Sequence, residues 1–129
     1  MQLLVVLLVF GASLALTLLI ETPIIVRGGV TENKAYIRGV NTVTNVLLNL
    51  TLFALQCLEA AGSDGNVVET VSGVWFLAAE LILIPVSESL LYLKLSSAGK
   101  KRVFFVTYLA NVTSCLAGVL IGILLRDWM

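Results

Sequence analysis

The sequence predicts an all-α integral membrane protein, with four transmembrane helices in one small bundle. Four apolar stretches of roughly 20 residues occupy nearly the whole chain, and about 20 helical residues cross a ~30 Å hydrocarbon core. Charged residues make up 12% of the sequence, about half of the ~25% that is typical of soluble domains. A chain of 129 residues would also have too small a core to bury four helices that are apolar on all sides.

The stretches predict a single transmembrane domain over residues 1–129, with spans at about 3–26, 40–58, 71–93 and 103–125. A cleaved signal peptide is the alternative interpretation of residues 1–20. Such a peptide begins with a positive charge, whereas Glu21 is the first charged residue of this chain. The apolar run also continues past Glu21, so we expect it to be the first span.

Basic residues predict the orientation of the chain. Seven of the eight lysines and arginines lie in the first and third connections, at Arg27, Lys34, Arg38, Lys94, Lys100, Lys101 and Arg102. The second connection has no basic residue and carries Glu59, Asp64 and Glu69. By the positive-inside rule, the first and third connections face the cytoplasm, and the N and C termini lie outside. We expect a multi-pass protein of the bacterial inner membrane.

Polar residues inside the predicted spans share one depth. This polar layer consists of Glu21, Asn45, Asn49, Glu80, Glu88 and Asn111. Counted from the cytoplasmic end of each helix at ~1.5 Å per residue, the six side chains lie about 8–20 Å into the membrane. Asn45 and Asn49 share a face of the second span with Asn41, and Glu80 and Glu88 share a face of the third. We expect these groups to meet inside the bundle.

The three glutamates of the polar layer predict a proton or cation site. A carboxylate near the bilayer centre costs ~2.5 kcal/mol or more on insertion scales and usually has a function. No lysine or arginine lies within the spans to neutralise them, so they must be protonated, share protons or hold a cation. We expect Glu80 and Glu88 as ligands or proton carriers and Glu21 as a third carboxylate.

In this interpretation the amides of Asn45, Asn49 and Asn111 are neutral oxygen ligands. A site of oxygen ligands suits a hard cation, namely Na⁺, Mg²⁺, Ca²⁺ or Mn²⁺. The alternative is that neutral glutamates and asparagines form hydrogen bonds that only fix the fold, each worth roughly 0.6–2 kcal/mol between transmembrane helices. The sequence identifies no catalytic residue and no cofactor-binding residue, and a hard cation is the one cofactor that it suggests.

Small residues on the last span predict helix packing. Ser114, Gly118 and Gly122 recur every four residues, a register that allows another helix to approach closely. Cys57 and Cys115 differ in depth by ~15 Å of helical rise, which is more than a disulfide spans. We therefore interpret the two cysteines as small apolar side chains.

Two local features complete the prediction of the backbone. Pro85 removes a backbone donor and frees the carbonyl of Leu81, which predicts a kink or an additional ligand in the third span. Residues 31–33 have the composition of a helix cap. They either begin a short interfacial helix that places Tyr36 at the headgroup level, or belong to a solvated linker.

Four motifs follow one another along the chain: ETP at 21–23, NVLLNL at 45–50, the glutamates at 80 and 88, and NVTS at 111–114. Their order resembles a group of small uncharacterised bacterial four-helix membrane proteins with a Glu-Thr-Pro turn, an NxLTNP-type helix, a two-glutamate helix and an Asn-bearing last helix. This chain has Leu48 and Leu50 where that pattern has threonine and proline. The resemblance implies no reaction, but it implies that the polar layer is one site.

The function that we expect is the binding or movement of a small cation or a proton-coupled solute. Four spans enclose little volume, so a complete pathway would need a homo-oligomer or a partner membrane protein. One alternative is an accessory subunit that docks onto a larger membrane complex. Another is an intramembrane enzyme acting on a lipid-like substrate, although the chain has no histidine, the usual proton shuttle at neutral pH. The formal net charge of +0 gives no attraction to nucleic acid, and the lipid bilayer is the expected surrounding partner.

Overall fold

The structure, a computed structural model, describes residues 2–61 and 74–126, and its regular structure is entirely helical. The elements are α1 (Gln2–Arg27), α2 (Lys34–Ala61), the π-helical turn η1 (Ala79–Leu83), α4 (Ile84–Tyr92) and α5 (Lys100–Arg126). Residues 74–78 are also α-helical. The prediction of an all-α fold is confirmed for these residues, which contain no strand. The second connection, with Asp64 and Glu69, and the predicted start of the third span at 71–73 lie outside the described residues.

Three of the described helices are long and apolar enough to cross a membrane: Phe10–Arg27, Val74–Tyr92 and Lys100–Leu124. The remaining helix, α2, is 28 residues long, which is also sufficient. It carries the asparagines at 41, 45 and 49 and, in its first five residues, Lys34 and Arg38, and it is not among these three helices. That α2 is a fourth span, and that both termini lie outside, remain predictions.

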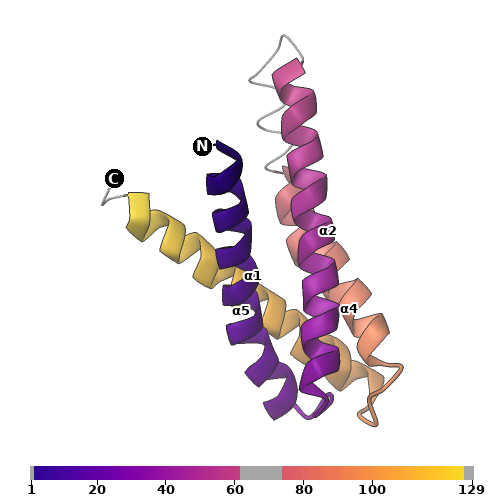
Figure 1. Cartoon of the computed structure of the whole chain (residues 1–129). Helices are drawn as coiled ribbons and strands as arrows, with labels where there is room; N and C mark the ends of the chain where they lie inside the picture. Colours follow the sequence, from indigo (N-terminus) through magenta and orange to yellow (C-terminus); the bar gives the residue numbers. More distant parts are fainter. Residues whose placement is uncertain (1, 62–73, 127–129) are drawn as a thin grey trace.

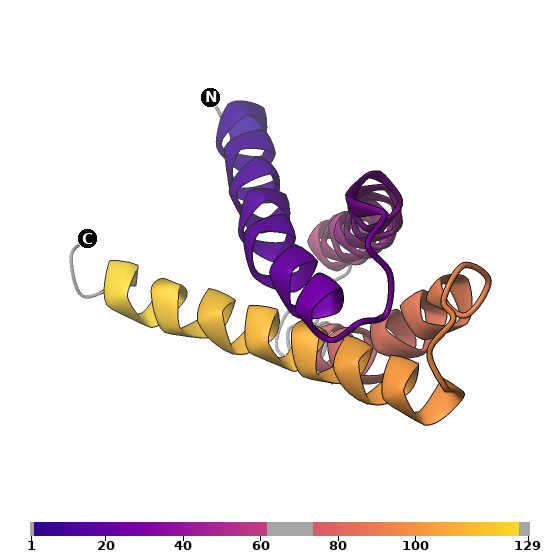
Figure 2. The same cartoon turned by 90° about the horizontal axis from the view of Figure 1, so that it is seen from below.

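The helices are close together at one end and diverge toward the other (Figure 1). The connections 28–33 and 93–99 lie at the close end, which we call the connection end (Figure 1). Of the seven basic residues, Lys94 lies in a connection, and the other six lie in the helix turns that adjoin the two connections. The start of α1 and the end of α5 lie at the opposite end (Figure 1). α1 packs against α2 and α5, and α4 packs against α5 and α2. In Figure 2, α4 and the end of α1 lie next to α5, and α2 lies between α1 and α4, away from α5.

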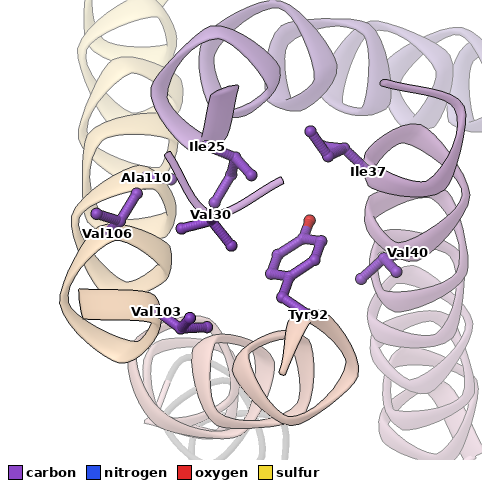
Figure 3. Packing of buried hydrophobic residues seen from close by; sticks show 8 residues of the cluster. All are labelled: Ile25, Val30, Ile37, Val40, Tyr92, Val103, Val106 and Ala110. Carbon is purple, nitrogen blue, oxygen red and sulfur yellow. The ribbon is translucent and has the colours of Figure 1, made fainter. Parts of the chain in front are cut away.

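An apolar cluster fills the connection end (Figure 3). It consists of Ile25, Val30, Ile37, Val40, Tyr92, Val103, Val106 and Ala110. The hydroxyl of Tyr92 donates a 2.7 Å hydrogen bond to Asn41 Oδ1, and the Tyr36 hydroxyl donates to the carbonyl of Leu91 at 2.9 Å. The two tyrosine rings meet edge to face at 6.2 Å. Tyr36 therefore packs onto this cluster from the first turn of α2.

The first connection is short and tightly held. Asn33 Oδ1 accepts a 3.0 Å hydrogen bond from the Tyr36 amide, so residues 31–33 cap α2 itself and no separate interfacial helix forms. Gly29 has a φ of 68°, a backbone conformation that favours glycine. A Cβ at Gly28 would overlap the Val106 side chain of α5, which shows that α1 and α5 approach each other closely here.

The π-helical turn η1 lies directly before Pro85, where a kink was predicted. In an unbroken α-helix, Glu80 and Glu88 would differ by about 80° around the helix axis, because eight residues exceed two turns of 3.6. A π-helical turn takes about one additional residue. It therefore brings the two carboxyl groups nearly into line on the face that points into the bundle.

Candidate intramembrane polar site

Glu88 of α4 is the most enclosed carboxyl group of the site, with 1% of the residue exposed. Its Oε1 accepts a hydrogen bond of 2.6 Å from the hydroxyl of Thr44 on α2. Its Oε2 accepts a hydrogen bond of 2.8 Å from the amide nitrogen of Asn111 on α5. One carboxyl group thus joins three helices through two neutral donors.

Glu21 of α1 is held in a similar way from one side. The residue is 2% exposed, and its Oε1 accepts a short hydrogen bond from the hydroxyl of Ser114 on α5. Its other oxygen, Oε2, is buried and has no hydrogen-bond partner among the described residues. Because an unpaired buried oxygen is costly, this atom is the natural place for a proton or a bound ion.

The three glutamates line one small polar cavity, together with Asn45 and Asn111. The cavity has a volume of about 10 Å³, which accommodates about one water molecule or a bare ion. No lysine or arginine is among the described residues that line it. The fold therefore brings carboxyl groups from α1, η1 and α4 together without a cationic side chain.

Of the six residues of the polar layer, Asn49 alone does not line this cavity among the described residues. Its amide nitrogen donates instead to Asn45 Oδ1 at 2.8 Å and to the Asn45 carbonyl at 2.9 Å. Asn45 in turn donates to Thr17 Oγ1 of α1 at 3.4 Å. Asn49 thus orients Asn45 and is one helical turn removed from the carboxyl groups. α2 runs through Leu48 and Leu50 without a break.

The amide orientations suit a carboxylate better than a metal ion. The nitrogen of Asn111 lies within hydrogen-bond distance of two acceptors, Glu88 Oε2 and the Thr107 carbonyl, at 2.8 and 3.1 Å. If the amide group were turned over, its oxygen would face these two acceptor oxygens in place of the nitrogen. Within the two described stretches of chain, no three side chains of the His, Cys, Asp and Glu types are grouped so as to hold a metal ion. A cation here would have to add hydroxyl oxygens, such as that of Thr44, to the carboxylates.

A larger side pocket of about 240 Å³ adjoins the polar cavity. Both are lined by Thr17 and Glu80, and the side pocket continues between α1, residues 76–80 and α5 to Cys115 and Gly118. These residues lie toward the end where the helices diverge. Glu80, which is only partly buried, therefore stands between the side pocket and the two enclosed carboxyl groups.

Sequence reasoning assigned Ser114 to helix packing, but its hydroxyl is a partner of Glu21. Gly118 and Gly122 have nothing within 4 Å of the position that a Cβ would occupy, so these two glycines do not make a close helix contact among the described residues.

Thr17, which lines the polar cavity, was not predicted. Its position one turn before Glu21, on the same face of α1, was the available signal. The two cysteines are free.

No protein-family model, curated protein or solved structure matches this chain. The function is therefore inferred from the enclosed carboxyl groups, their hydrogen-bond partners and the cavities around them. These features distinguish between the candidate ligands by size and by the hydrogen-bonding groups that each ligand needs.

Proposed function

We propose that this protein binds and exchanges protons within the membrane, with Glu88 and Glu21 as the proton-carrying groups. The observation that supports this proposal is the pairing of two enclosed carboxyl groups in one small cavity lined by neutral donors. Two ionised carboxylates so close together in a low-dielectric environment would repel each other strongly. At least one of them therefore holds a proton or a small cation.

The size of the cavity favours a proton or one small ion over a larger solute. About 10 Å³ admits roughly one water molecule, and an organic solute or a lipid headgroup does not fit. The nitrogen that Asn111 presents to Glu88 disfavours a divalent metal ion, which needs several oxygen ligands. Among the ions expected from the sequence, Na⁺ is the remaining candidate beside the proton.

The contacts of Glu88 accommodate either protonation state. Thr44 Oγ1 lies 2.6 Å from Glu88 Oε1 and 3.1 Å from the carbonyl of Val40. When Glu88 is ionised, the hydroxyl donates to the carboxylate. When Glu88 is protonated, its own proton is donated to Thr44 Oγ1, and the hydroxyl turns to donate to Val40. A proton can thus arrive and leave without a rearrangement of the helices.

The side pocket gives this site access toward the diverging end. A proton would pass Glu80 and Thr17 on the way to Glu21 and Glu88, since these two residues line both spaces. On the opposite side, the apolar cluster separates the site from the connection end. Transfer across the whole membrane would require this cluster to open, or a second copy or partner protein to supply the other half of the path.

Infrared spectroscopy of the reconstituted protein tests the proposal. At neutral pH we expect a protonated-carboxyl band that disappears at higher pH. The Glu88→Gln and Glu21→Gln variants should each weaken or shift this band while keeping the fold, because a neutral amide has the shape of a protonated acid. Glu32→Gln, an exposed change in the first connection, is the matched control and should leave the band unchanged.

Two results would refute the proposal. The first is a wild-type spectrum in which every carboxyl group is ionised by about pH 5, close to the ~4.3 of an unperturbed glutamate. The second is a band that responds to Glu32→Gln as strongly as to Glu88→Gln. If adding Na⁺ at constant pH removes the band in wild type but not in Glu88→Gln, the same site exchanges protons for sodium.

The second candidate function is that of an accessory subunit, and the observation that favours it is the exposed part of α5 near the diverging end. Gly118 and Gly122 are exposed and have open space at the Cβ position, which leaves room for a helix of another chain. Purification from the native membrane in a mild detergent tests it. A stoichiometric partner that is lost in a Gly118→Leu variant, but kept in Glu88→Gln, would favour the accessory role over proton exchange.

A further inference from the structure

A large groove on the outside of the bundle is unrelated to the polar cavity. It has a volume of about 710 Å³ and lies between α1 and the first turns of α2. Its lining is mostly apolar along α1, from Ala15 to Val26, and is basic at the connection end, at Arg27, Lys34 and Arg38. The groove shares no described lining residue with the polar cavity. Whatever it binds therefore makes no direct contact with the proposed proton site.

The basic end of the groove is arranged to receive an anion. Arg27 is the last residue of α1, and Lys34 and Arg38 are one turn apart at the start of α2. All three residues are exposed, and no acidic side chain is among the described residues that line the groove. The start of α2 also contributes the positive end of its helix dipole. Three like charges at one place are best neutralised by a ligand of opposite charge.

The apolar part of the groove indicates that this anion has a hydrocarbon chain. From Ala15 to Val26 the helix rises about 16 Å at ~1.5 Å per residue, a length comparable to half of the ~30 Å hydrocarbon core. Leu19, on this wall, is 74% exposed, so in a membrane it contacts lipid directly. An apolar wall that ends at three cations matches one leaflet of the bilayer and its headgroup layer. A free inorganic anion would use only the basic end.

We propose that this groove is a binding site for an anionic phospholipid. The phosphate lies among Arg27, Lys34 and Arg38, and one acyl chain follows α1 past Pro23 and Leu19 toward Ala15. Basic pockets at the membrane surface bind anionic headgroups in this manner. The lipid would join α1 to α2 on the side opposite α5 and so support the position of the two helices that carry Glu21 and Thr44.

Native mass spectrometry of the full-length protein in detergent provides the test. Phosphatidylglycerol and phosphatidylcholine with the same acyl chains are added, and inorganic phosphate is added as a competitor. We expect the protein to retain phosphatidylglycerol preferentially, and a single Arg38→Gln change to weaken its binding about fivefold. The combined Arg27→Gln, Lys34→Gln and Arg38→Gln variant should weaken it about a hundredfold, since each basic side chain near the surface contributes ~1 kcal/mol.

The matched control removes the same charge from the other connection at the same end. The Lys94→Gln, Lys100→Gln and Lys101→Gln variant changes three exposed residues outside the groove and should keep the preference. Ala15→Phe fills the apolar part without altering charge and should also weaken binding of phosphatidylglycerol. If the triple groove variant loses its helical circular dichroism and so cannot be interpreted, Ala15→Phe provides the test of lipid binding in its place.

Three results would overturn the proposal. Equal retention of the two lipids would show that the basic residues do not select the headgroup. Displacement of phosphatidylglycerol by inorganic phosphate at equal concentration would identify a site for a soluble anion. An equal loss in the control variant would show a general effect of surface charge. None of these results bears on the infrared test of Glu88, so the two proposals stand or fail separately.

Discussion

The two ends of the bundle differ in what fills the space between the helices. At the connection end, apolar side chains pack around Tyr92, and glycine allows α1 and α5 to approach closely. Toward the other end, the helices enclose carboxyl groups and two cavities, and α5 leaves the bundle with Gly118 and Gly122 uncovered. We infer from this comparison that the connection end provides most of the stability, and the proposed function places the groups whose charge changes toward the other end.

This division predicts the largest loss of stability at the centre of the apolar cluster. Tyr92 is 0% exposed, and Tyr92→Ala removes its ring and its hydrogen bond to Asn41. We expect a loss of about 3–5 kcal/mol, the range for removing a large buried ring. Thermal unfolding in detergent measures it. Tyr108→Ala, at a site that is 49% exposed, is the control, and equal losses in the two variants would break the comparison.

The second prediction concerns the close approach of α1 and α5. In Gly28→Ala, the added methyl group would overlap Val106 and lie near the carbonyl of Ile24. We expect a loss of about 1–3 kcal/mol, as is typical of overpacking. Gly39→Ala, inside α2 and with nothing within 4 Å of its Cβ position, should instead stabilise the protein by about 0.5–1 kcal/mol. A Gly28→Ala protein as stable as Gly39→Ala would mean that the connection end is loosely packed.

The sequence predicted the helices well because their length and apolar character are local properties. α1 and α5 begin and end within three residues of the predicted spans at 3–26 and 103–125. α2 begins six residues before the predicted span at 40–58. Its first five residues include Lys34 and Arg38, which lowered the apolar signal, whereas the cap at Asn33 decides where the helix begins.

The polar site was predictable in its members but not in its contacts. Depth along each helix indicated that Glu21, Glu88 and Asn111 lie at one level, and they line one cavity. That Thr44 is the partner of Glu88 depends on how α2 rotates against α4, which no local pattern specifies. The π-helical turn also escaped prediction, because sequence reasoning already placed Glu80 and Glu88 on one face of an ordinary helix.

The third prediction uses Thr44 to sharpen the comparison. Thr44→Val keeps the shape but removes the hydroxyl that contacts Glu88. A hydrogen bond between neutral groups contributes about 0.5–1.5 kcal/mol, and one to a charged group about 1.5–3 kcal/mol. If Glu88 is protonated at neutral pH, we expect a loss near 1 kcal/mol that increases when the pH is raised. Chemical denaturation at two pH values measures both losses.

The control for this change is Thr113→Val on α5, whose exposed hydroxyl donates only to the carbonyl of Leu109, within its own helix. It should change the stability by less than about 0.5 kcal/mol at either pH. A loss above about 1.5 kcal/mol for Thr44→Val at neutral pH, with no dependence on pH, would show that Glu88 is permanently ionised. Glu88 would then not be a group whose charge changes.

The smallest expected effect lies on the uncovered face of α5, at Gly118. A glycine inside a helix is about 0.5–1 kcal/mol less favourable than alanine, and a Cβ at this position meets nothing within 4 Å. Gly118→Ala should therefore stabilise the isolated chain by that amount, and Gly122→Ala should do the same. Unfolding of the detergent-solubilised protein, together with its mass from light scattering, measures stability and association at once.

If the Gly118→Ala and Gly122→Ala variants are instead less stable than the wild type and their mass falls to that of a single chain, another helix packs on this face in the wild type. The diverging end would then be an interface between chains, and the neighbouring chain would cover the side pocket that Gly118 lines.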